Sequence, residues 1–327
     1  MKPPVFVLGA PRSGTTLLYH MLLSSGQFAI YMAETHVFNL VGPRFGDLSH
    51  EANRQKLLDI WLRSFQFKRS GLHPEQFAAK IMKDCRSEGE LLRIFMEQIA
   101  ERQGLDRWAE CTPEHLLYLR QIKRALPDAK IIHIIRDGRD VALSETRQGW
   151  VRPLPWDRAH RLPVSGLYWE WIVRKGREEG RRIASDYVEV RFEELVGNPK
   201  AVLAGVSSFI GQCLNYETML DNAVGSLKTP NTSFAEDSKN KGFHPVGRWK
   251  SELADGELRA LESAIGPLLA ELGYPLACEN DKNSTSANLT AMRLRAFYPV
   301  YFASKLWLKS YTPLRHLTAV GILEESS

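Results

Sequence analysis

Cysteine is scarce in this sequence, and its spacing excludes the usual cysteine-based scaffolds. Four cysteines occur among 327 residues, and no two of them form a Cys-x-x-Cys pair (Cys85, Cys111, Cys213 and Cys278). This spacing indicates neither a zinc site nor a framework of disulfide bonds. Asp, Glu and His do not cluster at metal-ligand spacing either, so we expect reduced thiols and no metal.

The chain also lacks a concentration of charge of one sign. Lysine and arginine number 43 against 38 aspartates and glutamates, for a formal net charge of +5. No dense run of basic residues is interleaved with aromatics, so we do not expect a nucleic acid as partner. The mild positive balance suits a small anionic ligand better.

No long apolar run precedes the first predicted strand. Residues 1–4 read Met-Lys-Pro-Pro, and the apolar residues begin at Val5. This start leaves no room for a secretory leader or an N-terminal membrane anchor. On this ground we expect a cytoplasmic protein.

Apolar runs that are typical of strands alternate with segments of helical periodicity. We expect strands at 5–9, 28–32, 107–111, 130–135 and 187–192, and helices at about 14–25, 50–70, 88–103, from 168 and from 198. Such alternation favours a mostly parallel sheet flanked by helices. The sequence therefore predicts an α/β fold of three layers.

The length favours one large domain with a small appendage. We expect the domain at 1–276 and a linker at 277–290, which is rich in Asn, Ser and Thr. The extension at 291–327 is basic, aromatic and expected to be helical. Its periodicity leaves two interpretations open: a helix that folds back on the core, or a peripheral contact with a membrane or lipid.

The segment Gly9-Ala10-Pro11-Arg12-Ser13-Gly14-Thr15-Thr16 joins the first predicted strand to the first predicted helix. A strand, a glycine-bounded loop and a helix form the layout in which backbone N–H groups and a helix N-terminus face a phosphate. Thr15 stands where a nucleotide P-loop requires lysine, and Arg12 inside the loop is the compensating cation. We therefore expect a site for a phosphate-like anion that is not built for ordinary ATP chemistry.

A second anion site is predicted at 131–144. A buried strand ends at Arg136, and the carboxyl ends of parallel strands are where open α/β sheets bind ligands. The following helix carries Ser144, and Asp140 is its expected cap.

These two segments together resemble the sulfotransferases that use 3′-phosphoadenosine 5′-phosphosulfate (PAPS). Residues 11–16 resemble the family's 5′-phosphosulfate loop, which implies that Arg12, Ser13, Gly14, Thr15 and Thr16 bind the donor. The 131–144 segment is similar to the strand, loop and helix that hold the 3′-phosphate through an Arg and a Ser eight positions later, here Arg136 and Ser144. The resemblance covers about residues 4–273 and implies a P-loop-like fold.

The acceptor must lose a proton, so the chemistry requires a base. Ala33-Glu34-Thr35-His36-Val37-Phe38 resembles the Glu-x-His-x-Phe element of carbohydrate sulfotransferases, in which the Glu is the base. Glu34 and His36 are therefore the expected catalytic residues beside Arg12. Alternation in an extended segment places both on one side of the chain.

A third element, at 241–250, is similar to the segment that closes over the 3′-phosphate and adenine in this family. The resemblance implies that Lys241 and Gly242 contact the donor, and Arg248 is a further expected phosphate contact. Four positions depart from the family pattern: Asn240 replaces an arginine, Arg248 replaces an aspartate, Cys111 replaces a lysine, for which Lys80 or Lys83 could substitute, and Phe192 replaces a tyrosine.

The expected function is transfer of a sulfuryl group from PAPS to a hydroxyl, with release of adenosine 3′,5′-bisphosphate (PAP) and without a metal. A carbohydrate or lipid acceptor is preferred, and tyrosine stays open. The alternatives are a P-loop-type small-molecule kinase, disfavoured by Thr15, and a catalytically silent nucleotide-binding protein.

Overall fold

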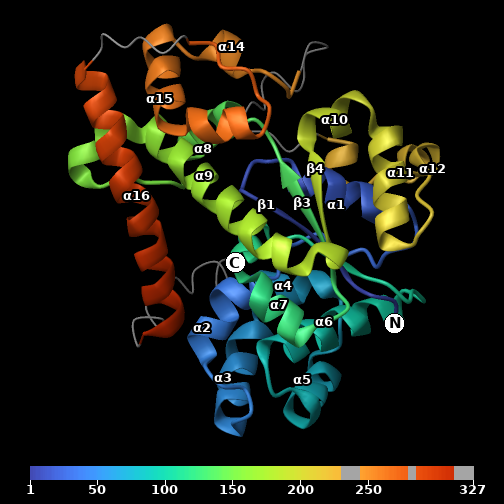
Figure 1. The fold of residues 1–327 in the computed structure, drawn as a ribbon. Coiled ribbons are helices and arrows are strands. Elements are labelled where there is room, and N and C mark those ends of the chain that lie inside the picture. The colour runs from blue at the N-terminus through green and yellow to red at the C-terminus, as the bar shows by residue number, and fades with distance from the viewer. Residues whose placement is uncertain (230–243, 279–284, 313–327) are drawn as a thin grey trace.

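A four-stranded sheet lies at the centre of the chain, in a computed structural model that describes residues 1–229, 244–278 and 285–312. Its strands run in the order β2-β1-β3-β4 and span Val5–Gly9 (β1), Ala109–Glu110 (β2), Lys130–Ile135 (β3) and Tyr187–Arg191 (β4). Every pairing is parallel: Val5 lies opposite both Ala109 and Lys130, and Ile131 lies opposite Tyr187. The predicted α/β fold with a parallel sheet is confirmed (Figure 1).

The central strands are buried on both faces. Phe6 and Leu8 of β1 pack into one apolar core, while Val5 and Val7 pack into a second core on the opposite face. This follows from the two-residue alternation of a strand, and it explains why β1 has a continuous apolar run. Helices α1 (Thr15–Ser24) and α11 (Pro199–Ile210) belong to the second core, and α9 (Arg161–Gly180) and α15 (Asp255–Glu271) to the first.

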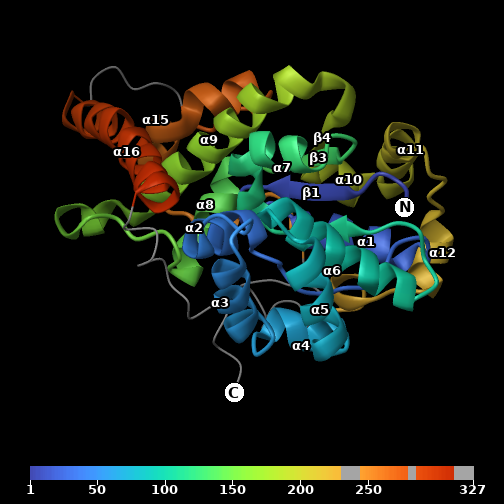
Figure 2. The same ribbon diagram turned by 90° about the horizontal axis from the view of Figure 1, so that it is seen from below.

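The other helices fill the space around these layers. Their bounds are Gly42–Phe45 (α2), Glu51–Trp61 (α3), Phe65–Ser70 (α4), Pro74–Asp84 (α5), Glu88–Arg102 (α6), Leu119–Ala125 (α7), Gly138–Gln148 (α8), Phe192–Gly197 (α10), Tyr216–Asp221 (α12), Trp249–Glu252 (α14) and Thr285–Tyr311 (α16). Short 3₁₀ turns lie at Pro113–Tyr118, Pro155–His160, Arg181–Asp186 and Gly225–Leu227, and a π-helical turn at Val37–Val41. Figure 2 shows the sheet edge-on between its helical layers.

The strand predicted at 28–32 is wrong. This segment is irregular, and the amide side chain of Gln103 accepts from the N–H of Ile30 and donates to its carbonyl. A side chain therefore satisfies backbone groups that a strand ladder would otherwise pair. The strand predicted at 107–111 shrinks to Ala109–Glu110.

The helix predicted from 168 begins earlier, at Arg161. Pro163 lies in the first turn of α9, where a backbone N–H has no intrahelical acceptor, so it does not interrupt the helix. The cap predicted for α8 is also wrong. The carboxylate of Asp137 caps this helix by accepting from the Arg139 N–H at 2.9 Å, and Asp140 lies inside the helix.

Helix α16 folds back on the core. It begins at Thr285, within the segment expected to be a linker. Leu294, Tyr298 and Phe302 are buried in the first core, and α16 contacts α9 and α15. No helix in the described ranges is long and apolar enough to cross a membrane.

Candidate active site

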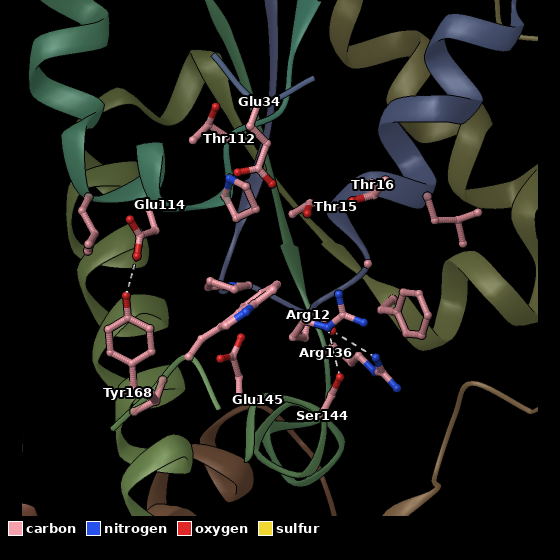
Figure 3. A pocket seen from close by; sticks show the side chains of 18 of the residues that line it. Arg12, Thr15, Thr16, Glu34, Thr112, Glu114, Arg136, Ser144, Glu145 and Tyr168 are labelled. Carbon is pink, nitrogen blue, oxygen red and sulfur yellow. Dashed lines mark hydrogen bonds between the residues drawn. The ribbon is translucent and has the colours of Figure 1, made fainter. Parts of the chain in front are cut away.

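A cavity of about 920 Å³ opens beyond the carboxyl ends of β1 and β3. Many parts of the chain contribute its walls, among them the loop after β1, the start of α1, the segment after α1, the 3₁₀ turn at Pro113–Tyr118, the end of β3, and helices α8, α9 and α16. The polar lining includes Arg12, Thr15, Thr16, Glu34, His36, Glu114, Arg136, Ser144, Glu145, Arg248, Lys305 and Lys309. Figure 3 shows how the labelled members of this set converge on one space.

The loop between β1 and α1 has a backbone that only certain residues adopt. Arg12 has φ of 65° and Gly14 has φ of 92°, both in the left-handed region. A Cβ added at Gly14 would fall inside the Phe192 ring, so glycine is required by space as well as by φ. The turn is closed by the Ser13 N–H, which donates to the Ala10 carbonyl at 3.1 Å.

The N-terminus of α1 faces this cavity. Gly14, Thr15 and Thr16 line it, and the first N–H groups of a helix have no acceptor within the helix. These donors, with the positive end of the helix dipole, suit an anion. The Ser13 side chain is fully buried and is not part of the lining, and a contact of Ser13 with the donor stays a prediction.

Arg12, Arg136 and Ser144 meet directly. The Arg12 Nε donates to the Ser144 Oγ at 3.0 Å, and an Arg136 Nη donates to the Arg12 carbonyl at 3.0 Å (Figure 3). The Arg12 guanidinium lies 5.6 Å from the centre of the Trp150 ring. The two anion sites that the sequence predicts therefore adjoin each other in one cavity.

Arg136 retains unused hydrogen-bonding capacity. Its Nε is buried and has no hydrogen-bond partner among the described residues. The guanidinium stacks 4.7 Å from the centre of the Phe192 ring, and burial lowers its pKa. Phe192 thus keeps the aromatic face expected there. An unsatisfied N–H on a buried cation fits an anionic ligand with several oxygens.

Asp140 fixes the second half of the third predicted element, 241–250. Its carboxylate accepts from the N–H groups of Gly247 at 2.8 Å and Trp249 at 3.0 Å. This holds Arg248 at the cavity, where it also pairs with Glu252 at 3.0 Å. Lys241 and Gly242 lie outside the described residues.

Glu34 lies on the wall of the cavity away from Arg136 (Figure 3). Burial raises the pKa of Glu34 to about 8, and the carboxylates of Glu110 and Glu114 act in the same direction. Its side chain is 45% accessible, but the accessible part faces the cavity, so solvent there tempers the shift without reversing it. Glu34 therefore holds a proton more tightly than an ordinary carboxyl.

His36 lies beside Glu34, with 3.4 Å between its Nε2 and the Glu34 Oε2. Burial, followed by the influence of His115, lowers the pKa of His36 to about 4. The ring is thus neutral near pH 7, and the contact with Glu34 is not an ion pair. His36 adopts φ of 53°, so the two side chains meet through a left-handed turn and not through the predicted extended alternation.

A buried polar network holds the Glu34 segment in place, and the sequence did not reveal it. The Thr112 Oγ1 accepts from the N–H groups of Thr35 at 3.1 Å and His36 at 3.3 Å. Glu110 in turn accepts from both threonine hydroxyls and lies 3.1 Å from the His115 Nδ1. Burial alone raises the pKa of Glu110, but His115 and the hydroxyls hold it at about 2. The only available signal was the polar cluster 110–115 at a predicted strand end.

Three further kinds of lining residue were missed. Glu145 follows Ser144 directly, and burial raises its pKa to about 7 against the opposing charge of Arg12. Glu114 accepts from the Tyr168 hydroxyl at 2.8 Å. Lys305 and Lys309 reach the cavity from α16, one helical turn apart.

These lysines are not the expected ones. Lys80 and Lys83 belong to α5 and are not among the residues that line the cavity, and Lys80 pairs with Asp84 at 2.9 Å. Cys111, at the position where related sequences carry lysine, is buried. Within the described ranges, no group of three or more His, Cys, Asp and Glu could hold a metal ion.

A parallel α/β sheet with a glycine loop, a helix N-terminus and two arginines at its carboxyl edge is typical of proteins that bind a phosphorylated ligand. The family model described as "Sulfotransferase family" matches residues 3–215. The chain therefore belongs to the sulfotransferase family.

Among curated proteins, the chain is similar to a putative protein-tyrosine sulfotransferase of Caenorhabditis briggsae, at 23% identity over 90% of this chain and 97% of the relative. A similar protein of Caenorhabditis elegans is 22% identical over 57% of this chain and 72% of the relative.

Solved structures share the fold. The sulfotransferase domain of the Synechococcus PCC 7002 olefin synthase has a TM-score of 0.57 at 22% identity, covering 84% of this chain and 97% of the domain. The sulfotransferase domain of the curacin biosynthetic pathway has a TM-score of 0.52 at 16% identity, covering 84% of this chain and 99% of that domain. At these identities the likeness concerns the fold alone.

Proposed function

We propose that the protein transfers a sulfuryl group from PAPS to a hydroxyl group of an acceptor and releases PAP. One observation carries this proposal: the Arg12, Arg136 and Ser144 side chains and the N-terminus of α1 converge in the same cavity that Glu34 faces (Figure 3). Membership of the sulfotransferase family supports the reaction class.

Arg12 and the first N–H groups of α1 receive the 5′ end of the donor in this proposal. As the sulfur–oxygen bond to the phosphate breaks, they take up the negative charge that develops on the leaving oxygen. Arg136 and Ser144 hold the 3′-phosphate, for which the buried Nε of Arg136 is available. Lys241, Gly242 and Arg248 stay predicted donor contacts.

Glu34 takes the proton of the acceptor hydroxyl while the acceptor oxygen bonds to sulfur. Its raised pKa makes it a strong base once it is ionised. His36 is neutral and acts by positioning Glu34, which it approaches at 3.4 Å. Proton, sulfuryl group and leaving phosphate are then all accounted for without a metal, and the absence of a metal stays a prediction.

The acceptor end of the cavity has a mixed wall. Apolar side chains from the second half of the 3₁₀ turn at Pro113–Tyr118, from α9 and from α16 lie next to Glu114 and Lys309 (Leu117, Tyr118, Trp171, Phe302 and Leu306). This wall favours a carbohydrate or lipid hydroxyl on a molecule with an apolar part. A tyrosine hydroxyl is the second candidate, because the Caenorhabditis briggsae relative, aligned over 97% of its length, is named a putative protein-tyrosine sulfotransferase.

Two other functions, a kinase and a silent nucleotide-binding protein, can be distinguished from a sulfotransferase by nucleotide preference and by turnover of PAPS. A P-loop-type kinase is disfavoured because α1 begins with Thr15 and Thr16, where the kinase motif requires a lysine followed by Ser or Thr. A silent nucleotide-binding protein would bind PAP but would transfer no sulfate from PAPS. A cytoplasmic location also stays a prediction.

The donor assignment is tested by calorimetric titration of the protein with PAP, AMP and ATP. We expect PAP to bind at least about tenfold more tightly than AMP, because the 3′-phosphate adds charge-assisted hydrogen bonds. Arg136→Ala should reduce the affinity for PAP by about 30-fold or more and leave the affinity for AMP almost unchanged.

The control variant is Arg147→Ala, which removes an arginine of helix α8 that is paired with Glu252 and does not line the cavity. Tighter binding of ATP than of PAP, with an ATP affinity that Arg136→Ala does not change, would contradict the proposal. Labelled PAPS that yields no sulfated product from carbohydrate, lipid or tyrosyl peptide acceptors would favour the silent binder.

A further inference from the structure

Helix α16 has two apolar faces. The inner face contributes Leu294, Tyr298 and Phe302 to the core. The opposite face, here called the outer face, carries apolar residues at intervals of three or four positions (Leu289, Met292, Ala296, Val300, Ala303 and Trp307). Val300 is 64% exposed and Trp307 is 57% exposed. A surface helix of a globular protein usually turns such apolar residues toward the core.

The outer face is free of the rest of the described chain. Figures 1 and 2 show α16 at the edge of the molecule, where it contacts α9, α15 and α2. Every member of the outer face is exposed. A continuous apolar row of this length on a helix surface marks an interaction site.

The loop before α9 extends the outer face. The Tyr298 hydroxyl accepts from the Leu154 N–H at 3.1 Å, and Arg293 pairs with Asp157 at 2.5 Å. These contacts fix the loop beside α16 and leave Trp156 70% exposed. An exposed tryptophan on a loop beside an apolar row is typical of a membrane–water interface.

The charges around this surface have one sign. Residues 146–164 and 285–311 together contain eight basic residues and one acidic residue, Asp157. Asp157 is buried, and its carboxylate is engaged by Arg293 and by the Tyr298 hydroxyl. Arg158, Arg161 and Arg293 are exposed and do not line the cavity, so the edge of the outer face is cationic, and two copies meeting on it would set like charges against each other.

We propose that the outer face of α16, with Trp156 beside it, docks on a lipid bilayer that contains anionic lipids. The apolar row enters the boundary between headgroups and acyl chains, and the exposed side chains of Arg158, Arg161 and Arg293 meet the anionic headgroups. The helix lies in the plane of the surface, because its inner face stays packed on α9 and α15.

The same helix lines the cavity with Tyr301, Lys305 and Lys309. Docking would thus place the acceptor end of the cavity close to the lipid surface. This consequence rests on the proposed function, since it concerns the acceptor, and it favours an amphiphilic acceptor drawn from the membrane. The docking itself does not depend on the reaction.

Co-sedimentation of the full chain with vesicles tests the docking, using phosphatidylcholine alone or mixed with phosphatidylglycerol. We expect the chain to sediment with the mixed vesicles and to be released by salt. The double variant Val300→Asp/Trp307→Asp should bind at least about tenfold more weakly, because two exposed apolar groups are replaced by anions. Leu220→Asp is the matched control, because Leu220 is 48% exposed on α12, on the other side of the molecule (Figure 1).

PAP binding by calorimetry should be unchanged in both variants, which shows that they fold and separates this test from that of the reaction. Should the double variant misfold, Val300→Ser is measured in its place. The proposal is overturned if the chain does not sediment with anionic vesicles, or if Leu220→Asp weakens binding as much as the double variant. A dimer that the double variant dissociates would instead assign the outer face to a second copy.

Discussion

At the scale of single residues, the cavity separates two carboxyls by their surroundings. Burial raises the pKa of both, to about 8 for Glu34 and to about 7 for Glu145, but Glu145 lies in the field of Arg12 and Glu34 in that of two further carboxylates. Glu34 faces the space proposed for the acceptor, whereas Glu145 adjoins Arg12, the arginine proposed to meet the donor (Figure 3). The two should therefore affect different steps.

Glu34→Gln should reduce kcat by about a hundredfold or more, which is the usual contribution of a general base. The affinity for PAP should not change. The wild-type kcat/KM should rise with pH and level off above about pH 8, since the base is the ionised form and protons occupy it below its pKa. Steady-state rates of sulfate transfer from labelled PAPS over this pH range supply the measurement.

Glu145→Gln is the comparison for this effect. Removing a carboxylate beside Arg12 should strengthen PAP binding, and the pH profile should keep its rising limb. If kcat of Glu34→Gln stays within about threefold of the wild-type value, or if its pH profile equals that of the wild type, Glu34 is not the base.

At the scale of elements, the loop between β1 and α1 depends on one glycine for both its conformation and its contact with Phe192. Gly14→Ala should destabilise the protein by about 1–3 kcal/mol through the left-handed φ and by more through the clash with the Phe192 ring. PAP binding should be lost, because the N-terminus of α1 shifts away from Arg12.

Gly26→Ala isolates the cost of conformation, since Gly26 has φ of 73° and an added Cβ there meets nothing within 4 Å. Urea unfolding should place this control between wild type and Gly14→Ala, with PAP binding intact. Equal effects of the two substitutions on binding would show that the loop has no special relation to the ligand.

At the scale of the whole molecule, the cavity joins parts of the chain that are far apart in sequence. Arg12, Arg136 and Lys309 come from the first strand's loop, the third strand's end and the last described helix. A ligand that bridges such parts binds the native state and not the unfolded chain, so it should stabilise the fold as a unit.

PAP at about 100 times its Kd should add about 2.7 kcal/mol to the free energy of unfolding, which should raise Tm by several degrees. Thermal unfolding with PAP and with AMP at equal concentration measures the difference. Arg136→Ala should abolish the extra shift that PAP gives over AMP. An equal shift from both nucleotides in the wild type would contradict a site for the 3′-phosphate.

The sequence by itself determined the parallel sheet and the two contiguous phosphate motifs. Residues 5–16 and 131–144 are local units, in which a buried apolar strand leads into a loop and then a helix, and their spacing suffices to predict the layout. The tertiary structure alone decided which distant groups share the cavity. Thr112 and Glu110 orient Glu34, and α16 supplies two lysines, because contacts across the sheet leave no periodic trace in the chain. The segment 28–32 failed as a strand for the same reason: the distant side chain of Gln103 satisfied its backbone.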